Sequence, residues 1–363
     1  MWVPSDVQRL KKVVSIKKEF PVKTPVRVVR LGQDLKASKL LRVSMPPPAQ
    51  TSTQKYTYSL SRGVSYSRLS SFLACRQRCA YECQGWRRIE SKESLTFGGM
   101  FHELLEHYYN MIRGKGVTYK HFKAELPDWI NAWVEPVCQN ALKKGADAEL
   151  VERCAALAAG LFPGYVERWK DDWTRRTWLA LEKEFKEPWH GHTLYGFRDG
   201  VFRESKKLWI LETKTKAQIE LDLGDAVTFD AQNLYYALAT ELEMKEHVTG
   251  VLYNVIRKPA WKLEGVPNDV VQKRAQMEST KDPKHFYVRY PVRISRQHLK
   301  RYGEELDAKL NDFKAWLEGK LPTYRNEGSC IQKWNCPFIP VCATGSYLGF
   351  QREEGKHDES GKA

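Results

Sequence analysis

The stretch LYGFRDGVFRESKKLWILETKTK, residues 194–216, decides the fold that we expect for this chain. It contains two apolar runs, 194–202 and 208–212, separated by a polar segment, and this pattern predicts a β-hairpin. Because side chains alternate across a strand, Glu212 and Lys214 point to one face and Thr213 to the other. Asp199 lies on the partner strand, where a suitable register brings its carboxylate beside that of Glu212.

Two crowded carboxylates repel each other unless a cation lies between them. Oxygen ligands with a lysine nearby suit Mg2+ or Mn2+, so Asp199 and Glu212 indicate metal-assisted hydrolysis of a phosphodiester. The alternative is an ordinary ion pair between Glu212 and Lys214 at the end of an edge strand. The apolar residues 209–211, directly before Glu212, argue against a solvated edge.

The chain is strongly basic, with a formal net charge of +15 over 363 residues. Such a charge predicts a polyanionic partner, of which nucleic acid is the commonest and a membrane surface the alternative. No run of eighteen apolar residues and no N-terminal secretion signal is found in the sequence. We therefore expect an intracellular protein that does not enter a membrane.

Composition divides the chain into three parts. Residues 1–56 are basic and end in a proline-containing linker, so they are expected to form an arm that contacts a nucleic-acid backbone or remains a solvated tail. Residues 57–345 form the main domain, with a helical insertion over about 117–175, a core over about 178–256, and a C-terminal helix and cysteine loop over about 290–345. Residues 346–363 are expected to be a polar tail.

Helical periodicity marks the segment before the hairpin. A helix is predicted from Ser65 or Ser67 as N-cap towards Cys83, with the thiols of residues 75, 79 and 83 on one face. A second helix over 95–113 carries His102 on its first turns, as a metal ligand or as a hydrogen-bonded structural group. The helices over 117–175 are interrupted at Gly160 and Pro163.

Strands and helices then alternate. A strand over 178–185, with Glu182 and Glu184 on one face, leads into the hairpin, and a helix over 227–244 and a strand over 248–256 complete a βββαβ order. Gln232 and Tyr236 are four residues apart on that helix and project from one face. A further strand is predicted over 281–291 and a long amphipathic helix over 296–317.

Three further cysteines, Cys330, Cys336 and Cys342, lie in a C-terminal segment with loop composition. Three thiols need a fourth ligand to complete a tetrahedral zinc site or a four-iron cluster. Cys75 is the nearest grouped candidate.

Taken in order, these elements resemble the PD-(D/E)XK nuclease superfamily, specifically its RecB-like exonuclease branch with an iron–sulfur cluster. That branch includes CRISPR-associated four-cysteine nucleases and many phage-encoded proteins. The resemblance covers roughly residues 65–345 and rests on the following motifs: Ser67 through Cys75, Gly98 to His102, Gly196 to Asp199, Glu212-Thr213-Lys214, Gln232 to Tyr236, and Cys330, Cys336 and Cys342. It implies an α/β restriction-endonuclease-like core with a mixed central sheet, flanking helices and a helical insertion.

The resemblance also implies a role for each residue. His102, Asp199 and Glu212 bind the catalytic Mg2+ or Mn2+, with the Thr213 carbonyl as a further ligand. Lys214 orients or helps to deprotonate the attacking water and stabilises charge on the phosphate, and Gln232 and Tyr236 hold the DNA backbone or Lys214. The [4Fe–4S] ligands, which join the two ends of the domain and for which zinc is the alternative metal, are Cys75, Cys330, Cys336 and Cys342. Cys79 and Cys83 are extra thiols, either of which could replace Cys75.

The expected activity is that of a metal-dependent deoxyribonuclease, an exonuclease acting in DNA recombination, repair or phage DNA processing. The alternative is a non-cleaving DNA-binding or assembly factor that retains the nuclease fold. Because the sequence has no GxxxxGK[ST] motif, DNA unwinding would need a helicase or recombination partner. The expected location is the cytoplasm, that of a host cell if the protein is phage-encoded.

Overall fold

The structure is a computed structural model, and it describes residues 58–89, 93–114, 116–143, 146–219, 223–261, 265–331 and 336–352. The chain divides into two units, 1–46 and 47–363, and every described residue lies in the second. The basic arm and linker expected over 1–56 lie outside the described residues.

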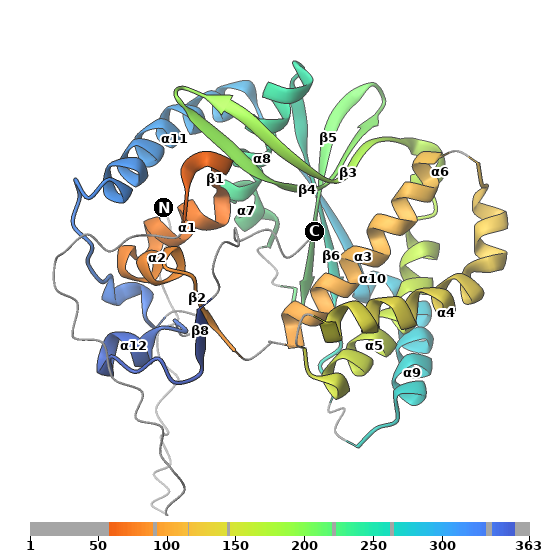
Figure 1. The fold of residues 1–363 in the computed structure, drawn as a ribbon. Helices are drawn as coiled ribbons and strands as arrows, with labels where there is room; N and C mark the ends of the chain where they lie inside the picture. The colour runs from red at the N-terminus through yellow and green to blue at the C-terminus, as the bar shows by residue number, and fades with distance from the viewer. Residues whose placement is uncertain are drawn as a thin grey trace, which may run out of the picture. The chain divides into compact units, whose positions relative to one another are not determined.

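A mixed six-stranded sheet forms the centre of the described unit (Figure 1). The strands are β1 (Val64–Ser65), β3 (Arg176–Trp189), β4 (His192–Glu204), β5 (Lys207–Lys216), β6 (Val248–Arg257) and β7 (Tyr287–Arg293). The order is β1-β4-β5-β6-β7, and β3 also pairs with β4. Only β1 with β4 and β5 with β6 are parallel among these pairs. The mixed sheet of the expected α/β fold is thus confirmed.

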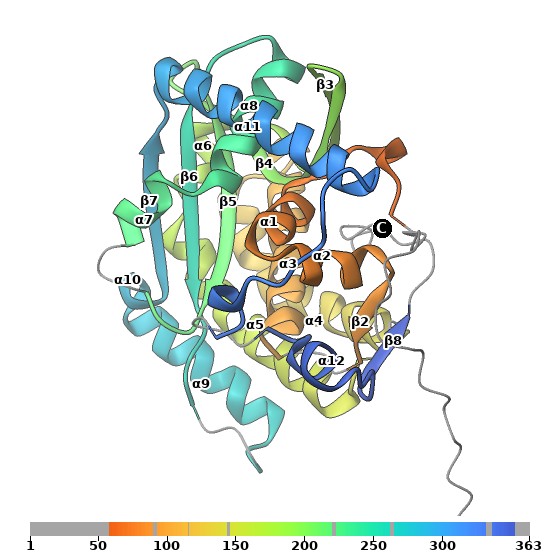
Figure 2. The same cartoon turned by 90° about the vertical axis from the view of Figure 1, so that its left-hand side faces the viewer.

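Helices cover both faces of this sheet (Figures 1 and 2). One face is covered by α1 (Tyr66–Ala74), α2 (Arg76–Cys83), α8 (Ala231–Met244) and α11 (Arg296–Leu317). The other is covered by α3 (Glu93–Gly114), α4 (Tyr119–Lys143), α5 (Ala148–Arg168) and α9 (Asn268–Lys281). The short elements are η1 (Leu60–Arg62), β2 (Trp86–Arg88), α6 (Asp172–Arg175), α7 (Leu223–Thr228), α10 (Pro283–Phe286), η2 (Glu327–Ser329), α12 (Ile339–Thr344) and β8 (Phe350–Arg352). Each face of the sheet therefore has its own hydrophobic core.

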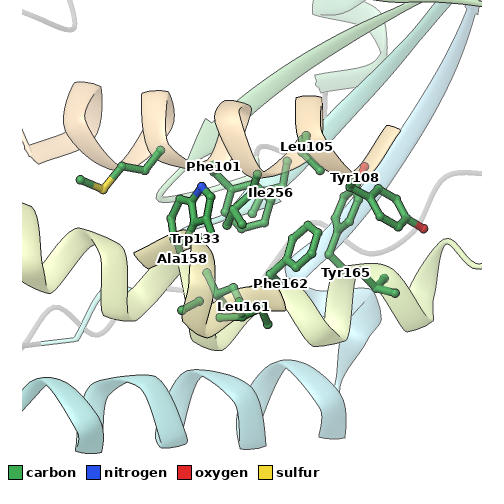
Figure 3. Close-up of a cluster of buried hydrophobic side chains, with 14 of the residues drawn as sticks. Phe101, Leu105, Tyr108, Trp133, Ala158, Leu161, Phe162, Tyr165 and Ile256 are labelled. Carbon is green, nitrogen blue, oxygen red and sulfur yellow. The ribbon is translucent and has the colours of Figure 1, made fainter. Parts of the chain in front are cut away.

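The core under α3, α4 and α5 is rich in aromatic rings (Figure 3). The helix α5 is central to it, and its residues 154–162 are all buried. The predicted interruption at Gly160 and Pro163 is wrong, because α5 runs unbroken through both. A Cβ at Gly160 would lie 2.3 Å from the carbonyl oxygen of Gln272 in α9. Close helix packing thus outweighs the unfavourable local propensity.

The helix predicted from Ser65 to Cys83 breaks at Cys75. Ser65 does cap α1, but Cys75 has extended backbone angles, and α2 begins at the next residue. The C-terminal loop binds at the break, where Asn326 Nδ2 and Ser329 Oγ both donate to the carbonyl of Ala74. The expectation of three thiols on one continuous helical face is therefore wrong, because Cys75 lies at the junction between the two helices.

Two other predicted boundaries are also corrected. The helix expected over 227–244 is split into α7 and α8, because the Asp230 side chain caps a new helix by accepting from the backbone N–H of Gln232. The strand expected over 281–291 begins only at Tyr287 and follows the unpredicted helices α9 and α10. Pro283 at the first position of α10 favours this helical start.

The end of the described chain returns to its beginning. The strand β8 lies within the segment expected to be a polar tail, and it pairs antiparallel with β2. Trp86 pairs with Arg352, and the Trp86 ring lies 4.2 Å from that of Tyr347. Among the described helices, none combines the length and the apolar character needed to cross a bilayer.

Candidate active site

The hairpin brings Asp199 and Glu212 together as its register was expected to do. Ser205 and Lys206 adopt positive φ angles in the tight turn between β4 and β5. Gly200 and Leu211 form the last pair between β4 and β5, and Asp199 and Glu212 are the next residues beyond that pair, one on each strand. Asp199 Oδ2 accepts a 2.6 Å hydrogen bond from the Thr213 backbone N–H. The carboxylate is thereby fixed to the Glu-x-Lys strand.

The side chain of His102 reaches this pair from α3. Its Nδ1 lies 3.5 Å from Asp199 Oδ1. A Cβ at Gly98 would lie 3.2 Å from Thr215 Oγ1, so the glycine lets α3 approach β5 closely. Burial alone would lower the pKa of His102, but the charge of Asp199 and hydrogen bonds to Asp199 and Glu182 outweigh it and raise the pKa to about 10.

A third carboxylate, Glu182 on β3, belongs to the same cluster. Its Oε1 lies 3.3 Å from His102 Nδ1. The residue has φ 40°, a left-handed conformation that is costly outside glycine. The register of β3 also shifts between Trp178 and Ala180. Sequence reasoning placed Glu182 on a strand before the hairpin but gave it no role, because neither irregularity can be read from the sequence.

Glu212 and Lys214 form the centre of the site. Glu212 is 2% exposed, and its Oε1 lies 2.5 Å from Lys214 Nζ. Its Oε2 is buried and has no hydrogen-bond partner among the described residues. Burial raises the pKa of Glu212 to about 7, with Lys214 opposing and Asp199 adding to the rise. Burial would lower the pKa of Lys214, but Glu212 and Asp199 raise it, so the ammonium stays charged.

The helix α8 holds the lysine from a second direction. Lys214 Nζ donates to Gln232 Oε1 at 3.1 Å, and Gln232 Nε2 donates to the Tyr236 hydroxyl at 3.1 Å. The predicted spacing of four residues does place Gln232 and Tyr236 on one helical face. The contacts form a chain in which Tyr236 fixes Gln232 and Gln232 fixes Lys214.

This donor set fits a divalent cation. The ligand atoms of His102, Glu182 and Asp199 lie within 4.8 Å of one another, a grouping that could hold a metal ion. The unsatisfied oxygen of Glu212 is a further oxygen donor. Carboxylate oxygens with one imidazole suit Mg2+ or Mn2+, and a cation would relieve the repulsion among three carboxylates.

The four cysteines expected to form a cluster come from the two ends of the described unit. Asn326 N–H donates to Cys75 Sγ at 3.4 Å, which ties the C-terminal loop to the α1–α2 junction. Burial raises the pKa of the Cys342 thiol, and the neighbouring Cys75 and Cys330 add to the rise. The pKa of the Cys336 thiol is likewise raised, first by burial and then by the neighbouring Cys342 and Cys75. These four thiols are therefore electrostatic neighbours.

Cys79 and Cys83 contact each other in the hydrophobic core. Their sulfur atoms are 3.8 Å from each other, and both residues are fully buried in the core under α1 and α11. Burial, followed by the contact with Cys83, raises the pKa of Cys79. Both side chains act as small core residues in this arrangement.

Residues 63–343 match the PD-(D/E)XK nuclease superfamily, and that span contains every side chain of the candidate site. The chain belongs to this superfamily. No curated protein matches it. Among solved structures, it is similar to a protein of Eubacterium rectale that is provisionally named an exonuclease. The identity is 10% and the TM-score 0.41, over 82% of this chain and 100% of the other.

Membership in the PD-(D/E)XK superfamily gives the chain a nuclease fold. The superfamily takes its name from an acid, a second acid and a lysine, and Asp199 followed by Glu212-Thr213-Lys214 has the form of that pattern. Divalent metals are used by these nucleases, in agreement with the donor set described above.

Proposed function

We propose that this protein is a metal-dependent DNA nuclease that hydrolyses phosphodiester bonds as an exonuclease. The observation that carries the proposal is the single buried constellation in which Lys214 contacts both Glu212 and Gln232 while Asp199 is held by the Thr213 N–H. The net charge of +15 supports a polyanionic substrate. The order of the motifs, which resembles the RecB-like branch, supports exonuclease action in recombination, repair or phage DNA processing.

In this proposal His102, Asp199, Glu212 and the Thr213 carbonyl hold Mg2+ or Mn2+, and Glu182 adds a carboxylate beside them. The cation supplies Lewis acidity at the scissile phosphate. Lys214 orients the attacking water and stabilises the charge that develops on the phosphate oxygens. Gln232 and Tyr236 keep the ammonium directed at the substrate.

Cleavage of end-labelled linear DNA, compared with a closed circle, tests the activity. Wild type should degrade the linear DNA with Mg2+ or Mn2+, and EDTA should abolish cleavage. Lys214→Met should lower cleavage by about a hundred- to a thousandfold, because the group that stabilises phosphate charge is lost. Lys273→Met, which alters a largely exposed lysine on α9, should cleave like wild type.

Three outcomes would contradict all or part of this proposal. Full activity of Lys214→Met would show that Lys214 does not have the catalytic role assigned to it. Binding of DNA with no cleavage under either metal would favour the non-cleaving DNA-binding or assembly factor. Cleavage of the circle would point to an endonuclease within the same metal-dependent chemistry.

We further propose that Cys75, Cys330, Cys336 and Cys342 hold a [4Fe–4S] cluster. The order of these cysteines, which resembles that of the RecB-like branch, favours the cluster over a zinc ion, and short paired Cys-x-x-Cys motifs, the commonest zinc arrangement, are missing from the sequence. The docking of the C-terminal loop at Cys75 supports a structural role.

Metal analysis of an anaerobic preparation tests the cluster. We expect a brown protein with about four irons per chain. Cys336→Ala should lose the iron and melt at a lower temperature, because metal binding is coupled to folding. Cys138→Ala, which alters a thiol on α4 far from these ligands in sequence, should keep its iron. A colourless wild-type protein with one zinc would show the cluster proposal to be wrong.

A further inference from the structure

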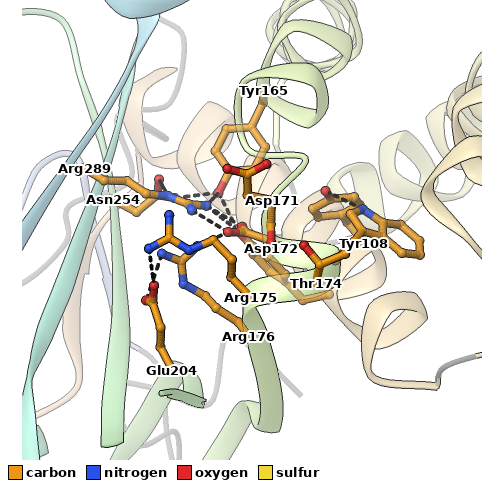
Figure 4. Close-up of polar contacts among 12 residues, drawn as sticks. Tyr108, Tyr165, Asp171, Asp172, Thr174, Arg175, Arg176, Glu204, Asn254 and Arg289 are labelled. Atoms are coloured by element: carbon orange, nitrogen blue, oxygen red, sulfur yellow. Dashed lines mark hydrogen bonds and ion pairs between the residues drawn. The ribbon is translucent and has the colours of Figure 1, made fainter. Parts of the chain in front are cut away.

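A buried polar network lies on the face of the sheet opposite Glu212 and Lys214. Figure 4 shows its members Asp172, Asn254 and Arg289. Three of its residues form one row across the sheet, because Thr213 on β5 pairs with Asn254 on β6, and Asn254 pairs with Arg289 on β7. Asp172 of α6, which is 0% exposed, ends the row. The network thus extends from the helical layer to the middle residue of the Glu-Thr-Lys motif.

Arg289 has a partner for each nitrogen of its guanidinium group. Its Nη1 and Nη2 donate to the two oxygens of Asp172 at 2.8 and 2.7 Å. The Nη2 also donates to the hydroxyls of Tyr109 and Tyr165 at 2.8 and 3.0 Å. Its Nε donates to Asn254 Oδ1 at 3.1 Å. With an acceptor for each of its nitrogens, this planar group is held in one orientation.

The orientation of Arg289 fixes that of the Asn254 amide. Because Asn254 Oδ1 accepts from an arginine, which has donors only, its Nδ2 must face the other way. There it donates to Tyr165 at 3.0 Å and to Thr213 Oγ1 at 3.2 Å. Thr213 in turn donates its backbone N–H to Asp199 Oδ2. An unbroken path of hydrogen bonds therefore connects Asp172 with an active-site carboxylate.

We infer that Asn254 and Arg289 are positioning residues for the nuclease site, acting through Thr213. This inference rests on the proposed function. Burying a charged pair is costly, and apolar residues of similar size often stabilise a fold as well or better. A network held at this cost behind Thr213 sets the direction of the strand that presents Glu212, Lys214 and the Thr213 carbonyl. Neither positioning residue touches the DNA.

A double-mutant cycle tests the path. Asn254→Asp keeps the size of the side chain and the acceptor for Arg289, but it removes the donor to Thr213. Thr213→Val removes the acceptor and leaves the backbone groups in place. Each single variant should lower kcat by ten- to a hundredfold, the usual effect of losing a partner behind a metal ligand, with KM for DNA within about twofold of wild type.

The double variant should be no slower than the slower single variant, because both changes break one contact. Losses in kcat that multiply, or an Asn254→Asp variant as fast as wild type, would overturn the inference. The matched control is Tyr287→Phe, on the same strand as Arg289, which removes a buried hydrogen bond to the Leu161 carbonyl. It should lower the melting temperature and leave kcat unchanged.

A second measurement does not depend on cleavage. Hydrogen exchange at the Thr213 amide should become faster in Asn254→Asp and stay unchanged in Tyr287→Phe. If wild type cleaves no DNA, the proposed function fails, and this exchange rate alone decides the positioning role. Unchanged exchange in Asn254→Asp would then overturn it.

Discussion

The two faces of β5 carry two charged clusters that differ in how well their charges are balanced. On one face, Glu212 contacts Lys214, and its Oε2 has no hydrogen-bond partner among the described residues. The grouping of His102, Glu182 and Asp199 adjoins this pair through Asp199. On the other, Asp172 is matched by Arg289, whose nitrogens all have acceptors. Burial of charge is common to both. The imbalance distinguishes the cluster that fits a cation from the cluster that supports the fold.

The largest effect is expected from removing the positive charge of Arg289 from the balanced cluster around Asp172. Arg289→Met leaves Asp172 buried with Arg176 as its remaining cationic partner, and the free energy of unfolding should fall by about 3–5 kcal/mol. Urea denaturation at neutral pH measures this loss. An Arg289→Met variant as stable as wild type would show that the network does not support the fold.

The pH dependence of the lost unfolding free energy provides a control for the Arg289→Met experiment. Burial would raise the pKa of Asp172, but the charge and hydrogen bonds of Arg289, together with the charge of Arg176 and the hydrogen bond from Tyr109, hold that pKa below its usual value. A depressed carboxyl pKa contributes stability above the unfolded value of about 4, and this contribution disappears as the pH falls through the folded pKa. The difference in the free energy of unfolding between wild type and Arg289→Met should therefore become smaller at acidic pH.

A smaller effect, on activity, is expected at Glu182. Glu182→Gln keeps the shape of the side chain but removes a negative charge beside His102 and Asp199. Cleavage should fall by ten- to a hundredfold, and half-maximal activity should need more Mg2+, because a charged neighbour of the cation is lost. Glu184→Gln, two residues along β3 at an exposed side chain, should match wild type. Equal activities of the two variants would exclude Glu182 from the metal site.

The smallest effect is expected from removing one negative charge, that of Glu212, from the active-site cluster. Without metal, Glu212→Gln should raise the free energy of unfolding by about 1 kcal/mol, because it removes a buried charge that Asp199 repels. The loss of a partner for Lys214 offsets part of the gain. Melting in EDTA measures the change, and added Mn2+ should stabilise wild type more than the variant. A Glu212→Gln variant with a lower melting temperature than wild type in EDTA would contradict the claim that the charges of the active-site cluster are unbalanced.

The local parts of the site could be predicted from the sequence. The hairpin places Asp199 beside Glu212 because strand alternation and a short turn fix the register within a few residues. The spacing of Gln232 and Tyr236 is likewise a property of one helix. The superfamily match confirms the mixed-sheet fold that these patterns predicted.

The parts that depend on distant contacts could not be predicted. The break at Cys75 is stabilised by a loop some 250 positions later. Asp172, Asn254 and Arg289 lie on three elements and come together only after the sheet has formed. Glu182 reaches the site through a left-handed backbone angle that no local preference for glutamate favours. Tertiary packing decides each of these positions.

The return of the C-terminal segment to α1 and β2 has a consequence for the order of folding. The contact between Asn326 and Cys75 closes a loop of 251 positions, whereas the β4–β5 hairpin closes within fourteen. Loop-closure entropy makes the long contact about 2.5 kcal/mol more costly. During synthesis, α1 and α2 leave the ribosome long before their partners exist. The hairpin can form while the chain is growing, but the docking of α1 and α2 must wait for the C-terminal segment.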